Sequence, residues 1–194
     1  MQTSNVFRRV TLVLAASSIV FLLGFDRQSG NDKGTDTDQM RIQKGFEVAP
    51  VPLNLEGKDR DLVGLGSYIV NSSGCTDCHT WPTWNPGGNP FLGQPEHMNT
   101  AVYLAGGRPF PAFPGVKSRN LTPDPNYGLP AGLTLQEFMD VMHHGQDQQN
   151  PGRILQVMPW PVFGKKTDYE LRAIYEYLRA IPSLPNNYEK PSTR

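Results

Sequence analysis

Cysteine is scarce in this sequence: two occur in 194 residues, and only two positions separate them. A framework of several disulfides is therefore excluded. An excess of either charge is also lacking, because 18 basic residues balance 18 acidic ones and no long run of one sign occurs. Such a surface does not attract a polyanion, so we expect no nucleic-acid partner.

Hydrophobic residues make up only 38% of the chain, whereas 19 glycines and 18 prolines are present. This composition predicts a loop-rich domain with few, short helices, which buries little apolar surface per residue. A large apolar cofactor at its centre would supply the missing buried area. The length accommodates one domain of ordinary size and no second enzymatic domain.

The one long apolar run lies near the N-terminus, from Val10 to Phe25, and follows the basic pair Arg8 and Arg9. Residues 1–25 are thus predicted to be a signal peptide or a membrane anchor, and the lack of a clean small-residue cleavage site favours the anchor. No cysteine lies near this segment, which excludes a lipoprotein anchor. A buried core helix is the alternative. Export would place the protein in the periplasm, tethered to the inner membrane.

After the apolar run, residues 26–50 are polar and poor in large apolar side chains. We predict that they form a flexible linker. No internal repeat is visible. The remaining segment, 51–190, is predicted to be the folded domain.

The two cysteines belong to the motif Cys75-Thr76-Asp77-Cys78-His79, the C-x-x-C-H signature of c-type haem attachment. Two thiols on one turn of chain can add to the two vinyl groups of a porphyrin, and the adjacent imidazole of His79 can then bind the iron. Three alternatives exist. A disulfide would close a very short loop, a thioredoxin-like pair needs a βαβ setting, and a zinc site needs a further ligand cluster.

A low-spin iron needs a second axial ligand on its other face. The candidates are Met98, Met139, Met142, Met158, His97, His143 and His144. We favour Met158, because Pro159 and Pro161 follow it and are predicted to hold the chain in an extended loop, where a thioether is accessible. Met158 could instead fill the core. Met139 and Met142 fall within a predicted helix, where core packing is the better interpretation.

Three helices are predicted, which makes the domain all-α. The first covers residues 58–72, where Gly66 among apolar residues indicates a close approach to another helix. The second begins at the capping box Thr134-x-x-Glu137 and ends at Gly145. The third begins at the capping box Thr167-x-x-Glu170 and packs against the first. Segment 80–132 is too rich in Gly and Pro for long helices and is predicted to be an ordered loop.

Further predictions concern other polar side chains near these elements. Arg119 offers a planar fork and Trp160 an indole N–H, so both are candidates for hydrogen bonds to haem propionates. His143 and His144 lie in the last turn of the middle helix, where a cationic side chain suits the helix dipole. His97 lies in a loop and is predicted to be solvated.

The haem motif, Met158-Pro159 and the flanking helices resemble those of class I cytochromes c. More narrowly, segments 118–124 and 133–138 resemble the cytochrome c modules of membrane-bound alcohol and sugar dehydrogenase cytochrome subunits. Those subunits usually carry three haem motifs, and this chain has one. The resemblance implies the cytochrome c fold around a single haem c, covalently bound through Cys75 and Cys78 and ligated by His79 and Met158.

These features predict an electron-transfer protein and not an enzyme. A dehydrogenase or quinol-oxidising complex would be the electron donor, and an oxidase or another cytochrome the acceptor. Two alternatives remain: a haem enzyme or gas sensor with an open iron site, and an integral electron-transfer subunit of a dehydrogenase complex.

Overall fold

The computed structural model describes residues 32–187, and this part of the chain is helical with no strand. The elements are α1 (Asp32–Val48), α2 (Arg60–Ser72), α3 (Cys75–His79), the short 3₁₀ turns η1 (Pro90–Leu92) and η2 (Thr100–Val102), α4 (Leu135–His144), α5 (Trp160–Phe163) and α6 (Asp168–Ala180). The observed helices agree with the predicted all-α class. The predicted export segment lies outside the described residues. Among residues 32–187, no helix combines the length and apolarity that a membrane crossing requires.

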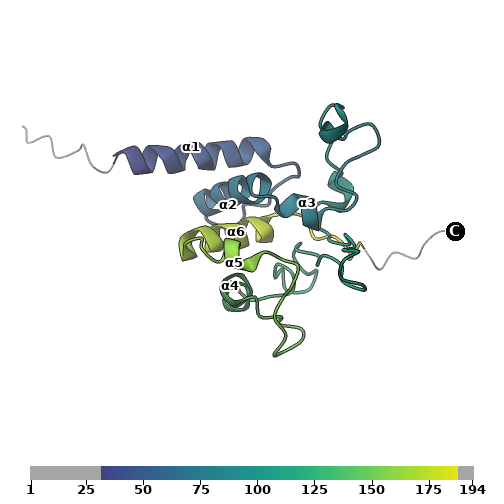
Figure 1. The fold of residues 1–194 in the computed structure, drawn as a ribbon. Helices are drawn as coiled ribbons and strands as arrows, with labels where there is room; N and C mark the ends of the chain where they lie inside the picture. Colours follow the sequence, from purple (N-terminus) through teal and green to yellow (C-terminus); the bar gives the residue numbers. More distant parts are fainter. Residues whose placement is uncertain (1–31, 188–194) are drawn as a thin grey trace, which may run out of the picture.

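Helix α2 lies between α1 and α6, and α4 and α5 pack beyond α6 (Figure 1). The contact between α2 and α6 is very close at Gly66, where a Cβ would come within 1.9 Å of the carbonyl oxygen of Ala173. Only a residue without a side chain fits there. The predicted close approach at Gly66 is thus confirmed, and it lets the fully buried residues of both helices meet in one core: Val63, Leu65, Ile69, Val70, Leu171, Tyr177 and Leu178.

The N-terminal helix α1 is a departure from the sequence-based expectation, which made residues 26–50 a flexible linker. From Asp32 to Val48 the chain is helical, and Ile42 is buried against α2. Backbones approach closely here too, because a Cβ on Gly45 would lie 1.8 Å from the carbonyl oxygen of Gly64. Helix α1 therefore belongs to the folded unit. Composition concealed this helix because its contact is made largely by small residues and by one narrow apolar stripe.

Polar contacts add to the docking of α1. The hydroxyl of Ser67 is buried and donates to the carbonyl oxygen of Gly45 at 2.7 Å. Arg41 pairs with Glu170 of α6 at 3.2 Å and lies over the ring of Tyr68, with its guanidinium carbon 5.4 Å from the ring centroid. Polar contacts of this kind stabilise the packed helix where little apolar surface is buried. A helix of polar composition can therefore still pack against the domain.

The helix ends follow the predicted signals. Both capping boxes are present, with Thr134 and Glu137 at the start of α4 and Thr167 and Glu170 at the start of α6. Gly145 ends α4 with φ of 66°, a left-handed conformation that glycine adopts without strain. Asp59 is the N-cap of α2, and its carboxylate accepts the backbone N–H groups of residues 61 and 62.

Segment 80–132 has no α-helix, as predicted, and contains only η1, η2 and isolated bridges. Its backbone groups are paired in successive turns, so the segment is ordered. The predicted loop is therefore confirmed. It continues directly from α3 (Figure 1).

Candidate functional site

Helix α3 carries both thiols and the imidazole of the predicted haem motif. Gly74 precedes it with φ of 79°, and this left-handed residue allows α3 to begin directly after α2. Cys75 and Cys78 lie on the same helical turn, both are half-buried, and they form no disulfide. The disulfide alternative is thus not realised in this structure. The two sulfurs are offered as separate thiols from a single short helix.

The orientation of His79 is set by one hydrogen bond. Its Nδ1 lies 2.7 Å from the carbonyl oxygen of Arg119. A carbonyl oxygen can only accept, so Nδ1 must carry the proton. Burial lowers the pKa of His79, and the neutral imidazole is therefore favoured. In that tautomer Nε2 keeps its lone pair, which is the form of histidine that binds a metal.

Burial raises the pKa of the Cys75 thiol to about 11, with the positive charge of Lys166 opposing the shift. At neutral pH this thiol is protonated. A nucleophilic or redox-active cysteine has the opposite property, a lowered pKa that exposes a thiolate. No group of three metal-binding His, Cys, Asp or Glu side chains occurs in the described part of the chain.

A second stretch of loop holds the C-terminal end of α3. The backbone N–H of Gly106 donates to the carbonyl oxygen of His79 at 2.7 Å, and the buried hydroxyl of Thr80 accepts the N–H of Leu104. Arg108 donates to the carbonyl oxygen of Asp77 and lies over the ring of Trp81, 5.3 Å from its centroid. The three groups of the motif are therefore fixed by contacts from residues 104–108 as well as by Arg119.

Met158 lies in a bend immediately before α5, half-buried against the hydrophobic core. The prediction of an extended chain after it is wrong, because residues 160–163 form the single helical turn α5. Proline is compatible with the first turn of a helix, where its missing N–H is not needed. Met158 itself stays outside the helix, as predicted. Of the alternatives, Met142 is buried in α4 and Met139 packs on the core, both as predicted.

The side chains of Arg119 and Trp160 both donate hydrogen bonds to the loop formed by residues 145–155. The guanidinium of Arg119 pairs with Asp147 at 3.3 Å, and the indole N–H of Trp160 donates to the carbonyl oxygen of Leu155 at 3.1 Å. The Trp160 ring also covers Gly145, where a Cβ would lie 2.4 Å from its Nε1. Both side chains thus connect the haem-motif region and α5 to one loop. Sequence patterns contain no signal for these pairings, of which the one between Arg119 and Asp147 joins residues 28 positions apart.

Asp147 is the centre of that loop, with a side chain only 5% exposed. Burial would raise its pKa, but hydrogen bonds from Asn150 and Gln149 and the charges of Arg119 and Arg153 outweigh burial and lower the pKa. Such a carboxylate contributes stability above its ordinary pKa of 3.8 and loses it as the pH falls through the lower folded-state pKa.

We expect Asp147→Asn to lower the free energy of unfolding at pH 7 by about 2 kcal/mol, because charged hydrogen bonds are lost from a buried site. The difference from the wild type should begin to shrink below about pH 4, where the unfolded-state carboxylate gains a proton, and should shrink further as the pH falls through the lower folded-state pKa of Asp147. Denaturant titrations at pH 7 and pH 3 measure both values. Asp36→Asn, at an exposed position of α1, is the control and should change little. An undiminished difference at pH 3 would contradict the proposed role of the charge.

His143 makes a bridge that sequence reasoning missed. Its Nδ1 lies 3.0 Å from the carbonyl oxygen of Gly164, and its Nε2 lies 3.0 Å from the carboxylate of Asp168. It therefore joins the end of α4 to the connection between α5 and α6. The sequence indicated only its place in the last helical turn. His97 is exposed, as predicted.

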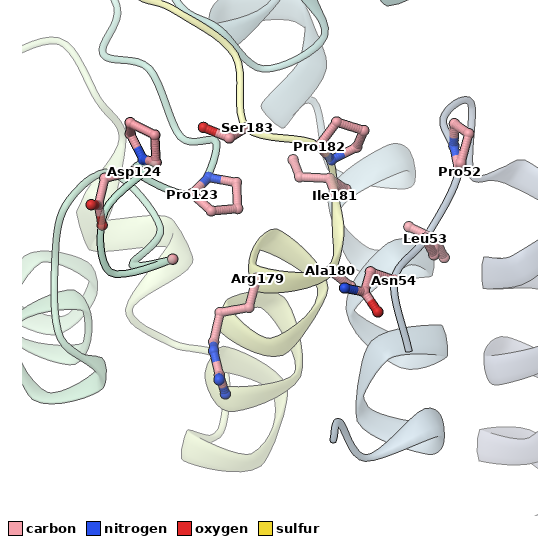
Figure 2. Close-up of a pocket in the computed structure, with 12 residues that line it drawn as sticks. Pro52, Leu53, Asn54, Pro123, Asp124, Arg179, Ala180, Ile181, Pro182 and Ser183 are labelled. Atoms are coloured by element: carbon pink, nitrogen blue, oxygen red, sulfur yellow. The ribbon is translucent and has the colours of Figure 1, made fainter. Parts of the chain in front are cut away.

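A surface hollow of about 530 Å³ lies at the end of α6 (Figure 2). None of the predicted site residues lines it. Its two charged side chains are already engaged: Asp124 accepts the backbone N–H groups of residues 126, 127 and 129, and Arg179 pairs with Glu176 at 3.0 Å. The remaining lining is largely proline and aliphatic. The hollow contains no cysteine, histidine or methionine, so α3 remains the candidate site.

Comparison with known proteins gives similarities over about three fifths of the chain. The chain is 29% identical over 120 residues to the protein named alcohol dehydrogenase (quinone), cytochrome c subunit, of Gluconobacter oxydans (strain 621H). The matched residues cover 61% of this chain and 21% of that protein. The protein of the same name from Gluconacetobacter polyoxogenes is 30% identical over 119 residues, covering 61% of this chain and 22% of that protein.

A third similar protein is the gluconate 2-dehydrogenase cytochrome c subunit of Pantoea cypripedii, 28% identical over 117 residues, with 60% of this chain and 22% of that protein covered. The chain thus spans about a fifth of the length of the curated relatives that it matches. No family model and no solved structure matches. The similarities support a cytochrome c module in this chain.

Proposed function

We propose that this protein is an electron carrier with one haem c, attached through Cys75 and Cys78 and ligated by His79 and Met158. The geometry of His79 carries the proposal. His79 lies on the helical turn that bears the two free thiols, and its Nδ1 donates to the carbonyl oxygen of Arg119. That hydrogen bond selects the tautomer and orientation that a metal-binding histidine needs. The similarity to proteins named cytochrome c subunits supports the same conclusion.

The donor set fits haem c well. Two thiols three positions apart, a neutral imidazole and a thioether are the groups that attach and ligate such a haem. When bound, the iron exchanges one electron between its ferric and ferrous states. The protein's own part is to orient His79 through the carbonyl oxygen of Arg119, to offer Met158 from a non-helical bend and to shield part of the half-buried imidazole from water. His79 and Met158 would hold the iron together and leave no position on it for a substrate, so the protein would act as a carrier rather than an enzyme.

Haem propionates would have to find donors on this surface. Arg119 uses one N–H group on Asp147 and has others to offer, whereas the only indole N–H of Trp160 already donates to Leu155. Within this proposal Arg119 is therefore the better propionate partner. Trp160 would first have to release the carbonyl oxygen of Leu155.

The proposal includes a periplasmic location, with residues 1–25 as the tether to the inner membrane. Only residues 26–31 separate the apolar run from α1. At about 3.5 Å per residue, six residues reach roughly 20 Å, so an anchored domain would stay close to the membrane surface. A dehydrogenase or quinol-oxidising complex would supply electrons, and an oxidase or another cytochrome would accept them. The similar proteins are named as subunits of alcohol and gluconate dehydrogenases, which supports partners of this class.

The direct test is spectroscopic. Protein purified from its native membrane should give a thioether-type haem spectrum in alkaline pyridine, with one haem per chain, and should titrate as a single one-electron couple. Mass spectrometry of the same sample reports the covalent haem and the state of the N-terminal segment. Full-length apoprotein without a thioether spectrum would overturn the proposal.

Replacing Met158 with alanine is expected to open one iron position. Reduced wild-type protein should not change its spectrum with carbon monoxide, whereas reduced Met158→Ala should bind it, and its reduction potential should fall because the thioether favours ferrous iron. The control Met139→Ala removes a half-buried methionine of α4 and should leave the haem spectrum unchanged. Prompt carbon monoxide binding by the wild type would favour a haem enzyme or gas sensor.

A further inference from the structure

A small projecting loop, residues 84–98, carries two large apolar side chains into solvent at its tip. Phe91 is 83% exposed and Leu92 is 71% exposed, the two highest values among leucine and phenylalanine side chains in the described residues. Trp84 and Met98 pair as an antiparallel bridge that closes the base of the loop. In Figure 1 the teal chain beside α3 projects from the helical body. We call residues 84–98 the apolar-tip loop.

The tip is held in one conformation by its own hydrogen bonds. The side chain of Asn89 accepts the N–H of Phe91 at 3.0 Å, and its carbonyl oxygen accepts the N–H of Leu92 at 3.0 Å. The N–H of Asn89 in turn donates to the side chain of Gln94 at 3.0 Å. Exposed apolar groups on an ordered tip lose little conformational entropy when they are covered, so the loop is preorganised for binding.

The base of the loop is fixed to the candidate haem helix. Its first residue comes five positions after His79. Just before it, the buried Thr83 donates from its hydroxyl to the carbonyl oxygen of Thr80 at 2.8 Å, and its own carbonyl oxygen accepts the N–H of Asn99 at 2.9 Å. A partner that holds the tip therefore also fixes the orientation of α3.

The charge of the loop indicates what covers it. Residues 84–98 contain no lysine or arginine, and Glu96 is their only acidic residue. Segments that bind anionic lipid combine apolar side chains with several basic ones, which this loop lacks. An apolar pocket in a protein needs no such charge, and an aromatic or aliphatic side chain seated in such a pocket can anchor a binding interface.

We infer that Phe91 and Leu92 insert into an apolar pocket of the redox partner protein and so orient α3 toward the partner's own cofactor. This inference rests on the proposed function, because it assigns the surface through which the carrier meets its donor or acceptor. The two side chains are then the docking anchors, and the remainder of the loop positions them.

The experiment uses full-length holoprotein and the membrane fraction of the source cells, with a quinol as electron source. The rate of haem reduction is measured against protein concentration for the wild type and the variant F91S/L92S. The variant is expected to raise KM at least tenfold, equivalent to about 1.4 kcal/mol, and to leave kcat unchanged. The control Tyr127→Ser removes an aromatic side chain that is 82% exposed on another loop and should leave KM within twofold.

Three further readouts separate the possible outcomes. Equal KM values for the wild type and F91S/L92S would overturn the docking inference and leave the proposed function intact. Weaker binding of F91S/L92S to phosphatidylcholine vesicles containing one third phosphatidylglycerol, or loss of a wild-type dimer in sedimentation, would also overturn it, since lipid or a second copy would then cover the tip. Failure of dithionite to reduce the wild type would contradict the proposed function itself.

Discussion

Replacing Gly66 with valine is expected to lower the free energy of unfolding by about 3 kcal/mol or more. A Cβ at this position would lie 1.9 Å from the carbonyl oxygen of Ala173 and 2.8 Å from the Cβ of Tyr177. Both neighbours belong to α6, and a backbone atom cannot rotate away as a side chain can. The helices must therefore separate, and the packing between their buried side chains is lost.

Denaturant unfolding of the holoprotein, followed by circular dichroism, measures this effect. Ser72→Val places the same side chain at an exposed position of the same helix and should change the stability by less than about 1 kcal/mol. A Gly66→Val variant with wild-type stability would show that the close crossing of α2 and α6 is not needed for folding.

The second large effect concerns the thiols of α3. The double variant C75A/C78A is expected to lose all covalently bound haem, because no other cysteine exists in the sequence. Any haem that remains would be held by His79 and Met158 alone and should be extracted by acidified organic solvent. Gel staining for haem peroxidase activity after denaturation, together with the intact mass, measures the loss.

The single variants provide the matched controls for this result. Cys75→Ala and Cys78→Ala should each keep one thioether bond, with a pyridine spectrum intermediate between free and doubly attached haem. Haem that resists extraction from the double variant would contradict attachment through these residues.

Several elements were predictable because their signals are local. The capping boxes at Thr134 and Thr167 lie within four consecutive residues, and both helices begin there as expected. The loop character of segment 80–132 follows from its Gly and Pro content, which disfavours a helix wherever the chain folds. The role of Gly66 was predictable because a glycine among apolar helix residues has few other uses.

Other elements depend on partners that are distant in the sequence. Helix α1 was expected to be a flexible linker because its composition is polar, yet Gly45 fits against Gly64 and Arg41 pairs with Glu170, 129 residues away. The turn α5 tolerates Pro161 in its first turn, and the end of α4 contacts it, since Gly145 packs against Trp160 and His143 lies 3.0 Å from the carbonyl oxygen of Gly164. No pattern in a short window contains such information.

The sequence by itself determined the chemistry of the candidate site: two thiols and an imidazole at fixed spacing, in a chain with no other cysteine. Only the tertiary structure decided the state of that imidazole, since the acceptor of the His79 proton is the backbone of Arg119, 40 residues along the chain. Spacing along one helical turn is a local property. Tautomer, burial and the orientation of the exposed tip at Phe91 depend on which distant segments the fold brings together.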